Sequence, residues 1–585
     1  MNKRIAVLLI ILLSIISYFN IFQNEFVWDD HDFILDNPDI RSFSNIPLFF
    51  TGDVDGLYRP LRSFHYTFVY SIAGKNEFLY HFNSLFFHML ISILVFFIIY
   101  EITNKRSISL IASLIFAAHP IHTGRVTNIT AGFDLFGIFF MILSFYLYVK
   151  FSKFNKKKYF LFSLLFFIIA LFASEEAITL PLLIVLYGFC FNKEMFKNIK
   201  NNIIKNYSAF FIAALLYVIL RFFALGIRGR MEEYLAGSFY LTMLTMLKAY
   251  VYYIHLLIFP INLTLFHDIK IAGSFFNFNV LISFFILVIV LILTLKFYKN
   301  RILFFSVFWF FIALIPMSNI LSLQVFMAER YLYVPSIGFS LLLSYFLFSI
   351  YNIKLKNLEQ RKILRYGVVV FIILLLGFYA LRTIDRNADF KNNLTLWSKT
   401  VKTSPNNSKA HNNLGFTYEH LGEGKKALEE FEIAVKLRPD NFKALTNLGA
   451  VYANLKRYNE SVFVLEKAIE IRQYDRTYDK LGLVYVEIGD EENAIEQFNE
   501  AIKINPRYAK AHNDLGTVYG RIGEFDLALE EFNTAIKIDK DYADAYYNLG
   551  ILLEFLDEED EARKNFENAL RLESDNELYI KKSGK

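Results

Sequence analysis

Long apolar runs recur along the first two thirds of the chain and stop at Arg382. A helix needs about 20 apolar residues to cross a hydrocarbon core of roughly 30 Å. Backbone groups in lipid must be hydrogen-bonded within their own segment, so runs of this length predict transmembrane helices. Twelve runs qualify or nearly do, and they cover residues 5–22, 83–101, 107–121, 132–150, 159–174, 177–192, 207–225, 240–260, 278–297, 302–321, 332–350 and 365–382.

Basic residues gather in alternate loops between these runs. Loops that are rich in Lys and Arg face the cytoplasm, whereas the opposite loops carry few basic residues. On this rule the long loop 23–82 and everything after Arg382 lie outside the cytoplasm. The basic loops lie at residues 3–4, 105–106, 150–158, 193–205, 296–301 and 354–365.

One stretch conflicts with a simple alternation of crossings. Two runs, 207–225 and 240–260, lie between the basic loop 193–205 and the outside loop 261–276, where an odd number of crossings is needed. The second run carries Lys248 and several Tyr, which are typical of an interfacial or re-entrant helix. We therefore expect eleven full crossings and one partial helix. Twelve full crossings would place the C-terminal part in the cytoplasm.

The first apolar run has two interpretations. It follows Lys3 and Arg4, as the apolar part of a signal peptide does. The residues after it, Ser17-Tyr18-Phe19-Asn20, are too bulky for a cleavage site. We expect an uncleaved first span.

A repeat with a period near 34 residues occupies the C-terminal part. This period and the accompanying small and aromatic positions are the signature of tetratricopeptide (TPR) repeats, which stack helix pairs into a solenoid. The repeat is marked by the dipeptides Leu414-Gly415, Leu448-Gly449, Leu481-Gly482, Leu515-Gly516 and Leu549-Gly550.

The predicted fold class is all-α, with a polytopic membrane helix bundle followed by a TPR α-solenoid. The predicted parts are a membrane domain 1–382, a connector with half a repeat 383–407, five repeats 408–441, 442–474, 475–508, 509–542 and 543–576, and a tail 577–585.

One in-phase position of the repeats suggests a ligand surface. Side-chain amides donate to and accept from a peptide backbone at once. A ladder of such residues on one face predicts a site for an extended polypeptide, and the alternative is that Asn is simply common on this exposed face. The ladder comprises Asn413, Asn447, Asp514 and Asn548, with Lys480 breaking the series.

Composition narrows the function further. The chain is 55% hydrophobic and holds 65 Phe, which agrees with a membrane protein. The single Cys190 excludes an intrachain disulfide and a Cys-based metal site. A net charge of +5 gives no indication of a nucleic-acid partner. Richness in Lys, Asn, Ile and Phe is typical of an AT-rich bacterial genome and predicts the bacterial plasma membrane.

Polar motifs collect at the predicted outside face. Carboxylates at the mouth of a membrane helix are costly to desolvate unless they are paired or used, and Trp28-Asp29-Asp30 follows the first span directly. The other motifs are Tyr58-Arg59-Pro60-Leu61, Tyr80-His81-Phe82-Asn83, His119-Pro120-Ile121-His122-Thr123, Asp134, Ser174-Glu175-Glu176 and Glu329-Arg330-Tyr331-Leu332-Tyr333-Val334-Pro335-Ser336.

These motifs, in this order and ending in TPRs, resemble the transmembrane-and-TPR-containing family of GT-C-fold glycosyltransferases, which are similar to protein O-mannosyltransferases. The resemblance covers nearly the whole chain. It implies a GT-C-like bundle, a polyprenyl-phosphate-linked sugar donor and an acceptor hydroxyl, with catalysis by an acidic residue of the first outside loop. The chain departs from the family pattern at Gly124, where an acidic residue is usual, and at Phe133, where a basic one is common.

Roles for individual residues follow from this chemistry. Transfer to a hydroxyl with inversion needs a carboxylate as general base, and we expect Asp29, then Asp30, in this role. A departing lipid phosphate is best stabilised by a guanidinium, and Arg330 and then Arg59 are the candidates. The alternatives are a solvated turn or cation site for Asp29 and a structural ion pair for Arg330.

The remaining candidates are less specific. His119 and His122 are spaced like half a metal site, but no third ligand is evident, so we expect them to bind substrate through hydrogen bonds. We expect no required cofactor, while a divalent cation stays open. Glu175 either lines the acceptor pocket or ends a span. The further expected substrate-binding residues are His81, Asp134 and Tyr331.

Three functions are consistent with the sequence. The leading one is a membrane glycosyltransferase that moves a mannose-like sugar from a polyprenyl phosphate to a hydroxyl, with the TPR array binding a polypeptide acceptor or partner. The alternative is a non-catalytic, membrane-anchored TPR scaffold for envelope complexes. A transporter or flippase would need charged or broken helices at the middle of the membrane, whereas the polar groups here lie near helix ends.

Overall fold

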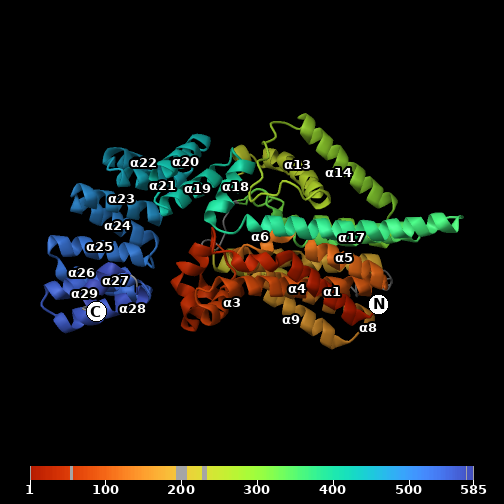
Figure 1. Ribbon diagram of the computed structural model, residues 1–585, viewed down its shortest axis with the longest axis horizontal. Helices are drawn as coiled ribbons and strands as arrows, with labels where there is room; N and C mark the ends of the chain where they lie inside the picture. Colours follow the sequence, from red (N-terminus) through yellow and green to blue (C-terminus); the bar gives the residue numbers. More distant parts are fainter. Residues whose placement is uncertain are drawn as a thin grey trace. The chain divides into compact units, whose positions relative to one another are not determined.

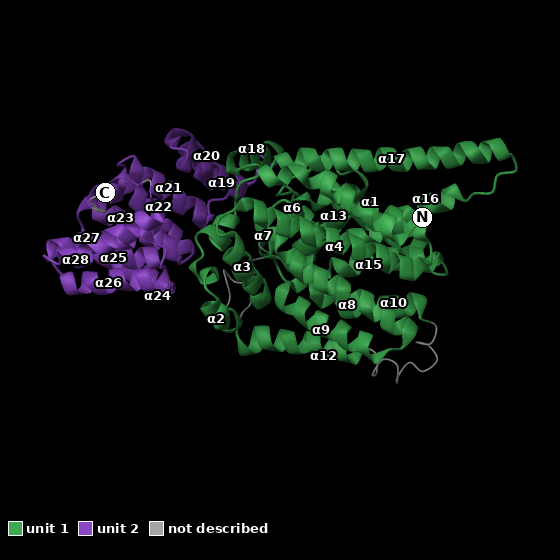
Figure 2. Cartoon of the chain, turned by 60° about the horizontal axis from the view of Figure 1, so that its bottom comes forward, with its two compact units in different colours: residues 1–403 green, residues 404–585 purple. Residues whose placement is uncertain are grey.

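The computed structural model describes residues 2–52, 57–192, 207–226, 234–323, 325–574 and 576–583. Within these residues every element is helical, which confirms the predicted all-α class. The chain forms two compact units, residues 1–403 and 404–585, shown in Figure 2 in green and purple. Each unit has its own core and is described by itself.

The first unit is organised around the long helix α4, Glu77–Thr103. Three further helices pack against it: α1 (Lys3–Tyr18), α5 (Arg106–Ala118) and α8 (Asp134–Phe154) (Figure 1). Small residues allow close approach, as usual where helices associate in lipid. A Cβ atom on Gly137 of α8 would lie 2.6 Å from the Cβ of Ser174, so only glycine fits beside the turn that carries Glu175.

All twelve predicted runs contain helix, and the chain is an integral membrane protein. Among the described residues six helical segments are long and apolar enough to span a membrane, and the bent pair Arg106–Ala118 and Pro120–Val126 adds a seventh. Three of the six segments are α13 (Phe239–Ile258), α14 (Phe278–Lys296) and α17 (Leu358–Ala388). The predicted runs also contain α9 (Lys157–Ala173), α10 (Leu180–Phe191), α12 (Ser208–Ile219), α15 (Arg301–Ala313) and α16 (Ser336–Tyr351).

The ambiguous run 240–260 corresponds to α13, a continuous helix of 20 residues that is long enough to cross. The basic loop 193–205 lies outside the described residues. The number of crossings and the orientation therefore stay predictions.

The predicted long loop 23–82 holds several helices. They include η2 (His31–Leu35), η3 (Pro38–Arg41), η4 (Phe43–Asn45), α2 (Ile46–Thr51) and α3 (Pro60–Ala73). Helix α3 begins with proline at its first position, where the ring fits and no donor is lost. It buries an amphipathic face that includes Tyr66 and Val69. No long apolar run marks α3 in the sequence, because only one face of this helix is buried.

The end of the membrane domain lies later than the sequence predicted. Helix α17 continues past Arg382 to Ala388, and α18 (Asn393–Thr403) still belongs to the first unit. Most of the predicted connector 383–407 is therefore part of the membrane domain, because Leu396 and Trp397 are buried in that unit.

The second unit consists of paired helices, one pair in each predicted repeat. The pairs are α19 (Ser408–His420) with α20 (Gly424–Leu437), α21 (Phe442–Asn454) with α22 (Tyr458–Ile471), α23 (Asp475–Ile488) with α24 (Glu491–Ile504), α25 (Ala509–Ile522) with α26 (Phe525–Ile538), and α27 (Ala543–Phe555) with α28 (Glu559–Leu572).

The predicted tail 577–585 is helical as far as Ser583. This helix, α29 (Glu577–Ser583), covers the last repeat by burying Tyr579, whose hydroxyl donates to Asp544 at 2.5 Å. A final helix of this kind closes the apolar end of a solenoid.

The glycine of each Leu-Gly pair is required by packing within the repeat. In α25 a Cβ atom on Gly516 would lie 3.0 Å from the ring of Phe532, which belongs to the second helix of the pair. Gly482 and Gly550 have the same relation to Phe498 and Phe566. The glycine therefore lets an aromatic ring fill the space between two antiparallel helices.

Gly516→Ala should destabilise its repeat by roughly 1–3 kcal/mol because the new methyl group overpacks against Phe532. Hydrogen exchange of the full chain should become faster in α25 and α26. Gly520→Ala is the matched control, since it lies one turn further in the same helix with no atom within 4 Å of a new Cβ. It should slow exchange through its higher helix propensity. Equal effects of the two changes would contradict this account.

Candidate functional site

The first unit contains a cavity of about 300 Å³ that brings together distant parts of the chain. Its lining includes residues from the first loop, from α3, from the segment before α8, from the turn after α9 and from the segment before α16. Six of the predicted site residues line it: Asp29, Arg59, Asp134, Glu175, Arg330 and Tyr331.

Arg59 is placed by the start of α3. The proline that follows disfavours helical geometry at Arg59, whose φ of −141° and ψ of 64° are not helical, and the helix begins at Pro60. The guanidinium consequently turns away from the helix toward two carboxylates, Asp134 at 2.8 Å and Glu175 at 3.5 Å. Burial opposes its charge, but these two carboxylates outweigh burial and raise the pKa of Arg59.

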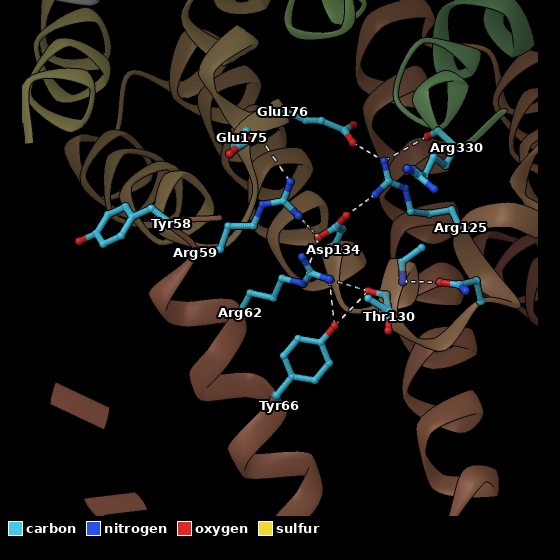
Figure 3. A network of polar contacts seen from close by, with 12 residues as sticks. Tyr58, Arg59, Arg62, Tyr66, Arg125, Thr130, Asp134, Glu175, Glu176 and Arg330 are labelled. Atoms are coloured by element: carbon cyan, nitrogen blue, oxygen red, sulfur yellow. Dashed lines mark hydrogen bonds and ion pairs between the residues drawn. The ribbon is translucent and has the colours of Figure 1, made fainter. Parts of the chain in front are cut away.

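Asp134 is the centre of the polar network. As the first residue of α8 it also lies at the positive end of a helix dipole. Arg59 bonds to one carboxylate oxygen and Arg125 to the other, at 2.5 Å, while Nε of Arg62 lies 3.3 Å away. Figure 3 shows the three guanidinium groups pointing at Asp134. Three cations around one carboxylate leave positive charge to be balanced by other groups.

Arg125 links this network to two more elements. It is 2% exposed, and besides Asp134 it bonds to Glu176 and donates to the carbonyl of Arg330 at 3.1 Å. The planar guanidinium presents donors in a fixed fork and suits such a bridge. Arg125 thus fixes the backbone of the segment that carries Arg330.

Glu175 and Arg221 form the far side of the cavity. Arg221 bonds to Glu175 at 2.7 Å. Burial opposes ionisation of Glu175, but Arg59 and Arg221 outweigh it and lower the pKa of this carboxyl. Glu175 is therefore charged and held between two guanidinium groups.

Arg330 differs from the other arginines that line the cavity. Among the described residues its guanidinium forms no ion pair and lies over the rings of Trp28, at 5.5 Å, and Tyr331, at 5.6 Å. Aromatic faces hold a cation without neutralising it. Its positive charge thus remains available to an anion that enters the cavity.

Asp29 lines the same cavity and follows a strained residue. Trp28 has a positive φ of 56°, which is uncommon for an aromatic residue. Its backbone N–H donates to the side chain of Asn393 at 2.8 Å, and its ring meets Trp397 edge-on. These contacts fix the turn from which the carboxylate of Asp29 projects.

Asp30, the second predicted catalytic carboxylate, has a different place. It is fully buried, it is not among the residues that line the cavity, and it accepts hydrogen bonds from Val27 and from both the N–H and the hydroxyl of Thr130. Burial raises the pKa of Asp30 to about 7 against these bonds. Its geometry is that of a group that ties the first loop to the segment before α8.

The three predicted histidines are likewise not among the described residues that line the cavity. His81 bonds to the carbonyl of Asn24 at 3.0 Å, His119 to the carbonyl of Leu257 at 3.0 Å, and His122 to the hydroxyl of Ser336 at 2.8 Å. Each is buried and joins two helices or loops. Sequence spacing could not separate this role from ligand binding.

Three arginines of the cavity were not predicted: Arg62, Arg125 and Arg221. For Arg125 a signal existed, because a lone arginine lies two residues after the His-Pro-Ile-His-Thr motif. The departures from the family pattern fit this arrangement. Gly124 is buried in α6 (Thr123–Val126). Phe133 carries no charge that could pair with Asp134, and its ring stacks on Tyr66 with ring centres 3.8 Å apart.

The predicted ladder of the second unit consists of two separate hydrogen-bonded groups of side chains. Asn412 donates to Asn413 at 3.1 Å, and Asn447 donates to Asn412 at 3.0 Å. The same pattern returns three repeats later, where Asn548 bonds to Asn513 and Asn513 to Asp514. All four predicted residues are half-buried, and the ligand role stays a prediction.

Comparison with known proteins agrees with this architecture. Residues 59–220 match the family described as dolichyl-phosphate-mannose-protein mannosyltransferase. Tetratricopeptide repeat families match residues 408–441, 442–475, 482–523, 521–554 and 543–576. The mannosyltransferase match covers Arg59, Asp134 and Glu175.

Three curated relatives extend over most of the chain. Protein O-mannosyl-transferase F38B6.6 of Caenorhabditis elegans is 27% identical over 72% of this chain and 61% of its own length. Protein O-mannosyl-transferase TMTC3 of Mus musculus is 27% identical over 73% and 50%. Protein O-mannosyl-transferase TMTC4 of Homo sapiens is 26% identical over 72% and 64%. The chain therefore spans between half and two thirds of these relatives.

The chain thus contains a region similar to the dolichyl-phosphate-mannose-protein mannosyltransferase family, followed by TPR repeats. It is similar to the TMTC protein O-mannosyl-transferases, so the resemblance that its motifs predicted is confirmed.

Arg125→Lys should lower thermal stability substantially, because one ammonium cannot bridge Asp134, Glu176 and the Arg330 carbonyl together. A buried carboxylate left without its partner costs roughly 3–5 kcal/mol. The midpoint of thermal aggregation in detergent measures the effect. Arg106→Lys, at the exposed start of α5, is the control and should leave the midpoint unchanged. An unaltered midpoint for Arg125→Lys would show that the bridge is dispensable.

Proposed function

We propose that this protein is a membrane glycosyltransferase that moves a mannose-like sugar from a polyprenyl-phosphate donor to an acceptor hydroxyl. The observation that carries the proposal is the presence of Asp29 and Arg330 in one cavity, where the guanidinium of Arg330 has no carboxylate partner among the described residues. The mannosyltransferase family match and the relatives named protein O-mannosyl-transferases support it.

The carboxylate of Asp29 serves as general base. It takes the proton of the acceptor hydroxyl while that oxygen attacks the anomeric carbon from the face opposite the phosphate. The bond between the sugar and the phosphate oxygen breaks, and the electron pair leaves with the polyprenyl phosphate. The anomeric configuration is inverted, because one displacement occurs.

Arg330 stabilises the leaving phosphate. Negative charge grows on the phosphate oxygens as the bond breaks, and a guanidinium pre-positioned in a partly buried cavity favours that state. The paired arginines, Arg59 and Arg125, hold the geometry of the cavity through their ion pairs. Because guanidinium groups supply the charge, we propose no required metal or other cofactor.

The donor's lipid portion has an apolar wall at hand. Val218, Phe222, Met317 and Leu321 line the same cavity as the charged groups. Such a wall suits a prenyl chain whose phosphate reaches Arg330. We place this site, loop 23–82 and the repeat array on the extracytoplasmic side of a bacterial plasma membrane, as the charge pattern of the loops indicates.

Asp29→Asn should abolish sugar transfer while leaving donor binding in place, because the amide cannot accept the proton. Loss of a general base costs about 10²–10⁴-fold in rate. The measurement is transfer of labelled sugar from polyprenyl phosphate to a Ser/Thr peptide. Arg330→Gln should instead weaken binding of the donor and of free polyprenyl phosphate.

Asp32→Asn is the control for the Asp29 substitution, because Asp32 lies in the same loop but does not line the cavity among the described residues. Full transfer by the Asp29→Asn protein would overturn the assignment of the base. A wild-type protein that transfers no sugar yet assembles envelope partners would favour the scaffold alternative.

We further propose that the repeat array captures the polypeptide that carries the acceptor hydroxyl. The hydrogen-bonded amide group that holds half-buried Asn413 and Asn447 supports this role, because amides hold a backbone without reading its sequence. Protein acceptors would then be favoured over polysaccharide.

Replacing Asn413 and Asn447 by Ala together should raise KM for a long unfolded acceptor by about three- to tenfold, the worth of one or two hydrogen bonds. KM for a short Ser/Thr peptide should not change. Asn533→Ala is the control, because this exposed residue of α26 bonds only within its own helix among the described residues. Equal changes for long and short acceptors would remove the array from acceptor binding.

A further inference from the structure

The segment from the end of α17 to the end of α18 contacts three pieces of chain that each carry a charged residue of the cavity. These pieces are the first loop with Asp29, the segment with Arg125 and the segment with Arg330. The contacts are made by Arg386, Asn387, Asn393 and Trp397. All four belong to the first unit.

Asn387 joins the first loop to the segment with Arg125. Its side-chain amide is fully buried, donates to the carbonyl of Ser17 and to Asn20, each at 2.9 Å, and accepts from the hydroxyl of Thr127 at 2.7 Å. The backbone carbonyl of Asn387 accepts a hydrogen bond from the side chain of Asn24 at 3.0 Å. A buried amide with all these partners has one arrangement only.

Arg386 holds the segment that carries Arg330. Its Nη2 lies 3.6 Å from the carboxylate Oε2 of Glu329, and both side chains are 3% exposed. Glu329 also accepts from the backbone of Thr264. The residue directly before Arg330 is therefore anchored to α17 and to the loop 261–276.

Asn393 and Trp397 hold the residue directly before Asp29. Asn393 accepts the N–H of Trp28, whose backbone is left-handed, and Trp397 and Phe266 meet its ring edge-on at 5.6 and 5.8 Å. The same ring lies under the guanidinium of Arg330. Trp28 is thus the point where the placement of the base and of the phosphate-binding arginine depend on α18.

We infer that residues 386–397 form a positioning element of the catalytic site: Asn393 and Trp397 set the placement of Asp29 and Arg330 through Trp28. The inference rests on the proposed function for its catalytic meaning. It also implies that the chain enters its repeat array directly from the helix that holds the site, since α18 ends at Thr403, the last residue of the first unit.

Kinetics of the full chain test the catalytic part. Asn393→Ala and Trp397→Ala should each lower kcat by about 10- to 100-fold, the cost of a misplacement near 1 Å, with little change in KM for the short peptide acceptor. Trp397→Phe should restore most of kcat by keeping the edge contact. Leu394→Ala, an exposed neighbour in α18, should behave as wild type. Unchanged kcat in both alanine variants would overturn the inference.

A labelling experiment tests the positioning without relying on transfer. Cys190 is the only cysteine, so Asp29→Cys in a Cys190→Ser background gives one reporter in the cavity. A soluble maleimide should label it several-fold faster when Asn393→Ala or Trp397→Ala is added, and at the original rate with Leu394→Ala. Equal rates in all proteins would sink the inference. If wild type transfers no sugar, the proposed function fails, and the labelling rates still decide the positioning role.

Discussion

The ion pairs of the Asp134 carboxylate with three arginines are the interaction on which the rest of the membrane unit depends. A buried charge is tolerated only when it is paired, and here three guanidinium groups converge on it from α3 and from the segment before α8. Their other bonds reach Glu175, Glu176 and the backbone of Arg330. The network around this one carboxylate therefore connects four parts of the chain: α3, the segment before α8, the turn after α9 and the segment before α16.

The same network separates two kinds of arginine. Those that touch Asp134 are neutralised in place and act as struts, whereas Arg330 lies on aromatic rings that hold it without cancelling its charge. This division explains how a cavity rich in arginine keeps one cation for a ligand. The strained Trp28 is tolerated because contacts from α18 fix its conformation while its ring supports Arg330.

The outcome for the site residues shows where sequence reasoning works. Motifs at helix ends predicted Asp29, Arg59, Asp134, Glu175, Arg330 and Tyr331, all of which meet in the cavity. The histidines and Asp30 belong to the same motifs but tie helices and loops together. Position in a motif did not separate the two groups, because a buried hydrogen bond and a ligand contact draw on the same kinds of polar side chain.

The sequence by itself determined the elements that local physics controls. Runs of apolar residues must become helices in lipid, and a period of 34 residues with small and aromatic positions must pair helices. Only the tertiary structure decided which polar groups share a cavity, and it assigned Arg62, Arg125 and Arg221 to the cavity and residues 383–403 to the membrane unit. The reason is that ion pairs and buried amides join residues hundreds of positions apart, as Asn387 joins Ser17, and no local pattern records such a pairing.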